Sequence, residues 1–273
     1  MSKDEARFSL DGLRRFATDL AECSGVPPAH AAGLVSHLLW FDSAGAGRFG
    51  VSTLVDWLER AEQGRVNVDA RGRFLGEQAA TGVFDGQNGL PPLILSRAAE
   101  VAGEKAREVG MGLVRVVNLG PAGPAAGVAA ELAVGPTIAV VLGPGPSWTM
   151  ALPAGEGLPA VFDSALAHKD GEEGGAPDWL GPIAPWIGAL VPDGGWLVLA
   201  LSVHAIEDLG ALHGRVGGAG LSSKAPGRLA PAAWEASRRL VRERGVVVEA
   251  NALERLADLA TRRGLALPER LSG

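Results

Sequence analysis

The sequence of 273 residues contains a single cysteine, Cys23, so it has no internal disulfide and suits a reducing compartment. It also has no long apolar run, because the longest nearly unbroken one, at residues 196–203, is far too short to cross a bilayer. The N-terminal residues are charged rather than apolar, which predicts no signal peptide. These absences together predict a cytoplasmic location and no membrane contact.

Concentrated positive charge is absent too. The net charge is −6, and no Lys/Arg cluster is longer than a pair beside other charges. A nucleic-acid-binding face is therefore not expected. None of the five histidines has zinc-ligand spacing to a second histidine with a third partner nearby. The sequence therefore predicts no metal site.

The chain does have the composition of a globular α/β protein, with 47% hydrophobic residues, 21% charged residues and 39 glycines. Apolar residues at helical spacing predict three N-terminal helices, and we expect residues 1–64 to form a helical subdomain. Residues 65–273 are expected to form an α/β core with C-terminal helices. Its predicted strands lie at residues 74–84, 113–117 and 137–142, and its predicted helices at 91–109, 125–133, 196–209, 231–244 and 251–263.

A glycine-rich turn follows the strand at residues 113–117 and includes Asn118, Gly120 and Gly123. Such a turn before a helix brings backbone N–H groups to a phosphate, or it simply packs closely between a strand and a helix. The packing interpretation is favoured, because Pro121 and Pro124 each remove a backbone donor and a lone glycine pattern is weak evidence.

Two charged residues are candidates for catalysis. Asp163 ends an expected strand, where a carboxylate either orients a catalytic histidine or caps the next helical turn, and the residues leave both roles open. Arg48 suits a bidentate clamp on a substrate carboxylate, but the favoured interpretation is a solvated or dimer-interface arginine. Ser222 and Lys224 lie in a sequence typical of a loop, without the signature of an oxyanion hole.

Residues 41–64 resemble the first signature of the malate/L-lactate dehydrogenase family, the NAD(P)-dependent type that is unrelated to Rossmann-fold lactate dehydrogenases. That family carries Arg-Gly-His-Asp-Ser-His-Gly before Val-Ser, and its second histidine transfers the proton. This chain has Ala-Gly-Ala-Gly-Arg-Phe-Gly at residues 44–50, followed by Val51 and Ser52. By this resemblance, Phe49 stands in the place of the proton-transfer histidine.

The resemblance continues at residues 83–90, 94–118, 161–165 and 246–268, in the order and spacing of the family's motifs. It implies an α/β malate/L-lactate dehydrogenase-like fold with an N-terminal helical subdomain, and a homodimer. It also places Asp163 where the family has an active-site aspartate.

Several departures affect the site that the resemblance implies. The family's Asn-Ser-Asn-His-Phe-Gly run corresponds to the turn from Asn118, where Pro121 replaces the histidine. Its Gly-Gly-His-Lys-Gly turn, which precedes a long helix and holds the dinucleotide, corresponds to Gly194 and Gly195, followed here by Trp196. The family's segments that line the site after residue 142 and after Asp163 are shortened. The candidate positions for NADH or NADPH are thus Asn118, Gly120, Gly123, Gly194 and Gly195, with weak or no binding expected.

Two hypotheses on function follow. The favoured one is a homologue without catalytic activity that acts as a binding or partner subunit, because both family histidines are replaced. The alternative is an active NAD(P)H-dependent reductase of a small 2-oxo acid or cyclic imino acid, with a rearranged site that uses Asp163 and Arg48.

Overall fold

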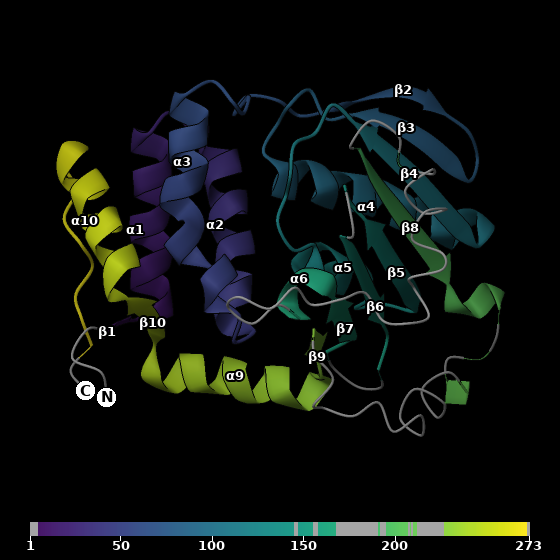
Figure 1. The fold of residues 1–273 in the computed structure, drawn as a ribbon. Helices are drawn as coiled ribbons and strands as arrows, with labels where there is room; N and C mark the ends of the chain where they lie inside the picture. Colours follow the sequence, from purple (N-terminus) through teal and green to yellow (C-terminus); the bar gives the residue numbers. More distant parts are fainter. Residues whose placement is uncertain are drawn as a thin grey trace. The chain divides into compact units, whose positions relative to one another are not determined.

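The computed structural model describes residues 5–144, 147–154, 158–167, 191, 195–206, 208, 210–211 and 227–271. The chain divides into two compact units, one of Met1–Asp69 with Trp234–Gly273 and one of Ala70–Ala233 (Figure 1). The C-terminal helices, which we expected in the α/β core, therefore cluster with the N-terminal helices. Gly194, His168, His213, Ser222, Lys224 and the expected loop at 170–185 lie outside the described residues.

The first unit contains three helices from the N-terminal part of the chain, and the sequence predicted all three. They are α1 (Leu10–Cys23), α2 (Pro28–Ser43) and α3 (Leu54–Glu62). Two short 3-10 turns, η1 (Gly47–Phe49) and η2 (Val51–Thr53), lead into α3. Ser9 caps α1, since its hydroxyl accepts a hydrogen bond from the Gly12 N–H at 3.1 Å. The buried leucines recur at helical spacing, as Leu13 and Leu20 in α1, Leu34 and Leu38 in α2, and Leu54 and Leu58 in α3.

The two ends of the chain meet in a small sheet that the sequence did not predict. Strand β1 (Glu5–Phe8) pairs antiparallel with β10 (Val246–Glu249), which lies between α9 (Pro231–Arg244) and α10 (Ala250–Arg262). Gly245 joins α9 to β10 with a φ of +77°, and a Cβ there would overlap the carbonyl of Phe8. Glycine is therefore required at this junction.

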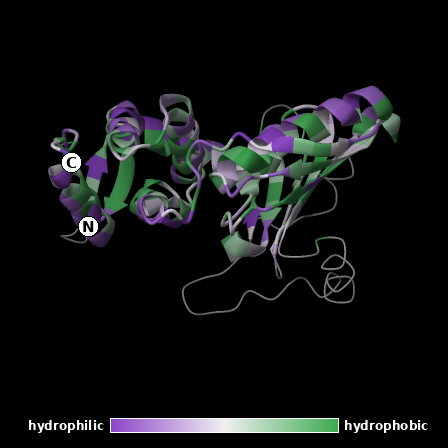
Figure 2. Cartoon of the chain, turned by 90° about the horizontal axis from the view of Figure 1, so that it is seen from above, coloured by the Kyte–Doolittle hydropathy of each residue, from purple (hydrophilic) through white to green (hydrophobic). Residues whose placement is uncertain are grey.

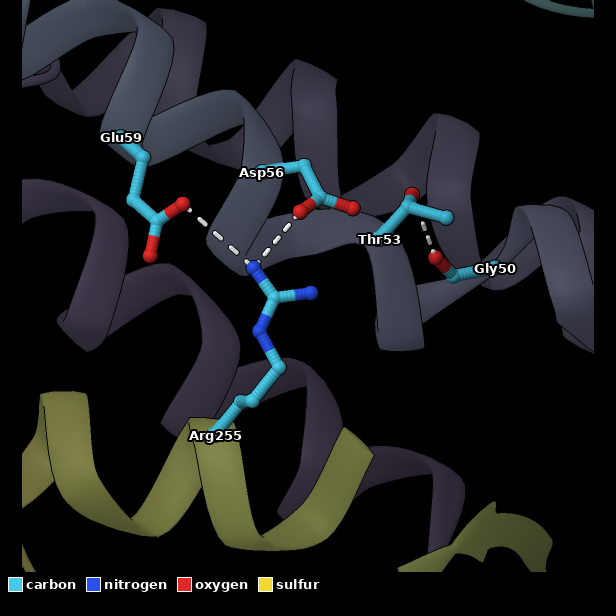
Figure 3. Close-up of polar contacts among 5 residues, drawn as sticks. All are labelled: Gly50, Thr53, Asp56, Glu59 and Arg255. Carbon is cyan, nitrogen blue, oxygen red and sulfur yellow. Dashed lines mark hydrogen bonds and ion pairs between the residues drawn. The ribbon is translucent and has the colours of Figure 1, made fainter. Parts of the chain in front are cut away.

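Helix α10 is tied to α3 by charged side chains (Figure 3). One Arg255 nitrogen lies 2.6 Å from Asp56 and 3.4 Å from Glu59. The hydrogen bond to Asp56, more than any other contact, raises the pKa of Arg255. All three groups are at least 39% exposed, so these ion pairs fix the helix contact more than they stabilise it.

The second unit contains an eight-stranded sheet. Its strands lie in the order β2-β3-β4-β8-β5-β6-β7-β9, and of the pairs described only β3 with β4 is parallel. Figure 2 shows hydrophobic colouring along much of the sheet. The strands are β2 (Arg73–Glu77), β3 (Thr81–Asp85), β4 (Met111–Val117), β5 (Thr137–Leu142), β6 (Trp148–Leu152), β7 (Ala160–Asp163), β8 (Trp196–Ser202) and β9 (Arg228–Leu229).

Among the described residues of this unit, helices α4 (Pro91–Val109), α5 (Ala126–Leu132) and α6 (Ser164–Ala167) accompany the sheet. The predicted end of α4 is confirmed, because Gly110 follows it with a φ of +90°. Helix α4 packs so closely on β4 that a Cβ at Gly112 would overlap the Ala102 carbonyl. Lys105, buried on the same helix, donates to Glu77 at 2.8 Å and to the Gln78 carbonyl at 2.7 Å.

The helix predicted at residues 196–209 is wrong. Residues Trp196–Ser202 form β8, which lies between β4 and β5 in the sheet, and Val203–Ala205 form the short 3-10 turn η4. A short apolar run bounded by turns fits a buried central strand as well as a buried helix, and periodicity alone does not separate them. This segment therefore offers no apolar helix face to a partner.

No helix in the described part of the chain is both long and apolar enough to cross a membrane.

Candidate functional site

The parallel strands β3 and β4 end in a tight polar network in the second unit. One Asp85 carboxylate oxygen accepts hydrogen bonds from the Asn118 side-chain amide and from the Gln87 N–H, each at 3.0 Å. The bond from Asn118, followed by that from Gln87, lowers the pKa of Asp85. The carboxylate therefore stays ionised and holds the two strand ends together.

The same network contains every non-glycine residue with a positive φ in the described part of the chain. These are Gln87 and Asn88, both at +53°, and Asn118 at +52°. The Asn88 N–H donates to the Asn118 carbonyl at 2.8 Å, which joins the two strained segments. Such strain collects at sites that the surrounding structure fixes firmly. Asn118, a candidate from the sequence, is here a positioning residue for Asp85.

The glycine-rich turn continues from Asn118 into α5. Gly123 has a φ of +74°, so its backbone conformation favours glycine. No described atom lies within 4 Å of where a Cβ at Gly120 or Gly123 would be. The close packing that we favoured from the sequence is therefore not the reason for these two glycines. Pro121 is exposed on the turn, and by the resemblance it stands where the family's Asn-Ser-Asn-His-Phe-Gly run has its histidine.

Trp196 fills the space beside this turn. Its ring nitrogen donates to the Gly120 carbonyl at 3.2 Å, and the residue is only 1% exposed. Gly195, a candidate for the cofactor turn, is buried directly before β8. The resemblance places the corresponding glycines before a long helix, so the expected helix N-terminus is not formed at Gly195. The sequence did not reveal the contact of Trp196 with Gly120, which lies 76 residues earlier.

Asp163 is buried at the end of β7, at 2% exposure. Its carboxylate accepts hydrogen bonds from the Thr149 hydroxyl at 2.7 Å and from the Ala165 N–H at 2.8 Å. Burial raises the pKa of Asp163, and bonds from Thr149 and from backbone N–H groups, including that of Ala125 in the glycine-rich turn, oppose this rise. The carboxylate thus caps α6 and also reaches the turn.

Arg48 and Phe49 lie in η1 of the first unit. The Arg48 guanidinium lies over the Phe49 ring, 4.8 Å from its centroid, and the Phe49 and Phe41 rings are 6.0 Å apart. The cluster extends through Trp40 to Trp234, with centroid distances of 4.9 and 5.0 Å. By the resemblance, the position of the family's proton-transfer histidine is therefore part of an aromatic cluster, and the Phe49 ring itself has no proton to transfer.

Asp42 is a residue of this region that the sequence analysis missed. Its carboxylate accepts a hydrogen bond from the Val51 N–H at 2.9 Å, and a Cβ at Gly50 would overlap it. Burial raises the pKa of Asp42 to about 7, and the bond from Val51 opposes this rise. An aspartate among apolar residues of a helix was the available signal, because buried aspartates are rare unless paired. Asp42 thus leaves no room for a side chain at position 50.

Three histidines lie among the described residues, and one of them, His37, borders the aromatic cluster around Phe49. His30 contacts the Val68 carbonyl at 2.6 Å, and the His37 ring packs on Phe41 at 5.2 Å. Burial lowers the pKa of His37 to about 4. His204 is exposed on η4. Within the part of the chain that the structure describes, no three His, Cys, Asp or Glu side chains are grouped so as to hold a metal ion.

Comparison with known proteins agrees with this architecture. Residues 8–156 match the model of the malate/L-lactate dehydrogenase family. The chain is 27% identical over 118 residues to a malate dehydrogenase of Pyrococcus abyssi, covering 43% of this chain and 33% of that protein. It is 28% identical over 132 residues to an L-sulfolactate dehydrogenase of Methanocaldococcus jannaschii, covering 48% and 36%. The matches thus span about a third of the length of these relatives.

Solved structures extend the similarity to the fold of nearly the whole chain. Malate dehydrogenase from Pyrococcus horikoshii superposes with a TM-score of 0.83 at 18% identity, covering 99% of this chain and 98% of that one. Delta1-piperideine-2-carboxylate reductase from Pseudomonas syringae superposes with a TM-score of 0.73 at 16% identity, covering 93% and 99%. With the matched family model over more than half of its length, the chain belongs to the malate/L-lactate dehydrogenase family of oxidoreductases.

Proposed function

We propose that this chain is a member of its oxidoreductase family without significant catalytic activity, which acts as a binding or partner subunit. The observation that carries the proposal is the environment of Phe49. Its ring centroid lies 6.0 Å from that of Phe41, and the Arg48 guanidinium lies over the ring. A phenyl ring transfers no proton, and losing one acid–base group typically costs roughly 10²–10⁴ in rate. Pro121 at the second histidine position removes a further group of this kind.

The surroundings of Asp163 support the same proposal. Its described partners are the Thr149 hydroxyl and backbone N–H groups, and no described imidazole is among them. A carboxylate that already accepts several hydrogen bonds serves as a helix cap, and the described residues offer it no histidine to orient. Arg48 also has an aromatic partner in Phe49, as expected for an arginine with a structural role.

The family's NAD(P) cofactor does not fit the described residues that the resemblance assigns to it. Pro121 supplies no backbone donor, and the Gly120 carbonyl already accepts from Trp196. Gly195 precedes a strand rather than a helix, so it provides no helix N-terminus for a phosphate. Asn118 is engaged with Asp85. We therefore propose weak or no binding of NADH and NADPH, and we assign no chemical step to them.

We expect no detectable oxidation of NADH or NADPH by the purified chain with pyruvate, oxaloacetate or a cyclic imino acid at neutral pH. The reason is the loss of both proton-transfer positions, Phe49 and Pro121. Steady-state absorbance assays measure this directly. A clear rate that Asp163→Asn abolishes would contradict the proposal and support the alternative, an active reductase with a rearranged site, because the raised pKa of Asp163 suits a residue that holds a proton.

As a partner subunit, the chain needs a surface for association with a second copy or with a relative. Four large apolar side chains, of Val109, Met111, Val134 and Ile206, are 39–67% exposed. Their segments meet at one end of the large sheet, where Ser202 donates to the Gly110 carbonyl and Val203 to the Pro136 carbonyl. Exposed apolar groups gathered in this way favour association. We expect light scattering to show a dimer, and a stable monomer at micromolar concentration would contradict it.

A further inference from the structure

We propose that Trp196 is an internal plug, whose indole occupies a site for a flat aromatic ring between Gly143 and the Gly120 carbonyl. The inference rests on the proposed function, because it names the group that occupies the space beside the glycine-rich turn. Trp196, Gly143 and Gly120 all belong to the second unit.

The floor of this site is Gly143. Strands β5 and β8 are antiparallel, with Leu142 opposite Leu197, so Gly143 lies across from Trp196 just beyond the last pair. A Cβ at Gly143 would lie 2.5–2.9 Å from three carbons of the Trp196 ring, closer than any real carbon contact. The ring therefore lies flat against the backbone at a position where only glycine allows it.

The polar end of the site is the Gly120 carbonyl. The indole N–H donates to it at 3.2 Å, so the plug satisfies one hydrogen-bond acceptor of the turn. Trp234 provides an internal comparison, because it is also buried, at 4% exposure, but its ring nitrogen has no hydrogen-bond partner among the described residues. The polar contact thus distinguishes Trp196 from Trp234.

These contacts define what the site accepts. A ligand must be planar to lie on Gly143 and must carry an N–H donor at its edge to reach Gly120. The chain supplies such a ring from its own β8 strand, so a ligand of this class enters only when Trp196 leaves. Trp196 therefore acts as an autoinhibitory group that occupies the space between Gly143 and Gly120, in addition to the substitutions at Phe49 and Pro121.

The test removes the plug and offers a replacement ring. Trp196→Ala should bind indole, seen as a rise in melting temperature and as heat in calorimetry, and the wild-type chain should not. It should bind 1-methylindole about 5-fold more weakly, the order expected for one lost hydrogen bond. Trp234→Ala is the matched control, and there the two compounds should not differ. Equal binding of both compounds, or of neither, by folded Trp196→Ala would overturn the plug.

A second variant covers the case in which Trp196→Ala does not fold. Trp196→Phe keeps a ring on Gly143 but lacks the N–H, so amide hydrogen exchange across residues 119–126 should become several-fold faster. Unchanged exchange there would overturn the inference. Failure of the proposed function appears instead as NADH turnover by the wild-type chain, so the two failures are distinguishable.

Discussion

Replacing Asp42 by asparagine is expected to stabilise the first unit by about 4 kcal/mol above pH 7. Burial raises the pKa of this carboxyl from 3.8 to about 7, which is a rise of about three units at roughly 1.4 kcal/mol each. Between these pH values the folded chain holds a proton that the unfolded chain has released. The stability that this proton provides is present below pH 3.8 and is lost as the pH rises to about 7.

Urea unfolding of the Asp42→Asn variant and the parent chain at pH 5 and pH 8 measures this difference. The gain over the parent should be at least twice as large at pH 8 as at pH 5. Asp19→Asn is the matched control, because it removes the same charge from an exposed position on α1 of the same unit. The same gain in the free energy of unfolding from Asp42→Asn at both pH values would contradict this prediction. It would mean that burial does not disfavour the ionised carboxylate in the folded chain.

The variant His37→Leu is expected to become more stable relative to the parent chain as the pH falls. Burial lowers the pKa of His37 from 6.5 to about 4, so in this range the unfolded chain takes up a proton that the folded chain does not. The parent therefore loses stability from this group between pH 6.5 and pH 4, to a total of about 3 kcal/mol. The variant lacks this loss, and its advantage over the parent should be larger at pH 4.5 than at pH 7.5.

The two groups are five residues apart on α2, and their effects oppose one another. Between about pH 4 and 6.5, the folded chain holds a proton on Asp42 that the unfolded chain has released, and it lacks a proton on His37 that the unfolded chain holds. The two contributions to the pH dependence of the free energy of unfolding therefore cancel in this range. In each single variant, the free energy of unfolding should therefore show the pH dependence that the other group causes. His204→Leu, at an exposed position, is the control for His37→Leu. Parallel pH profiles for His37→Leu and the parent chain would contradict the account.

Local signals in the sequence predicted the helices well. Helix α4 shows why, because its apolar spacing and the glycine stop at Gly110 are both encoded within about twenty residues. Strand β8 was predicted as a helix, since an unbroken apolar run fits either buried element. Strands β1 and β10 were not predicted, because each is completed by a partner at the other end of the chain.

The candidate site was less predictable, since its contacts join residues that are distant in sequence. Family resemblance identified Phe49 and Pro121 as substitutions, but it gave no sign that the Trp196 ring lies on Gly143. Asp163 was left with two possible roles, and its bond to the Ala165 N–H is the contact that a helix cap makes. Asp42 was missed because the reason for its burial, the approach of Gly50 and Val51, appears only in three dimensions.

The central claim is that this family member has lost its cofactor chemistry, and titration of NADH and NADPH fluorescence against the purified chain tests it most directly. With Trp196 on the glycine-rich turn and no helix N-terminus at Gly195, we predict no saturable change in emission at protein concentrations up to about 100 μM, which limits the binding free energy to about −5.5 kcal/mol or weaker. A saturable change with a dissociation constant in the micromolar range or tighter would contradict the account.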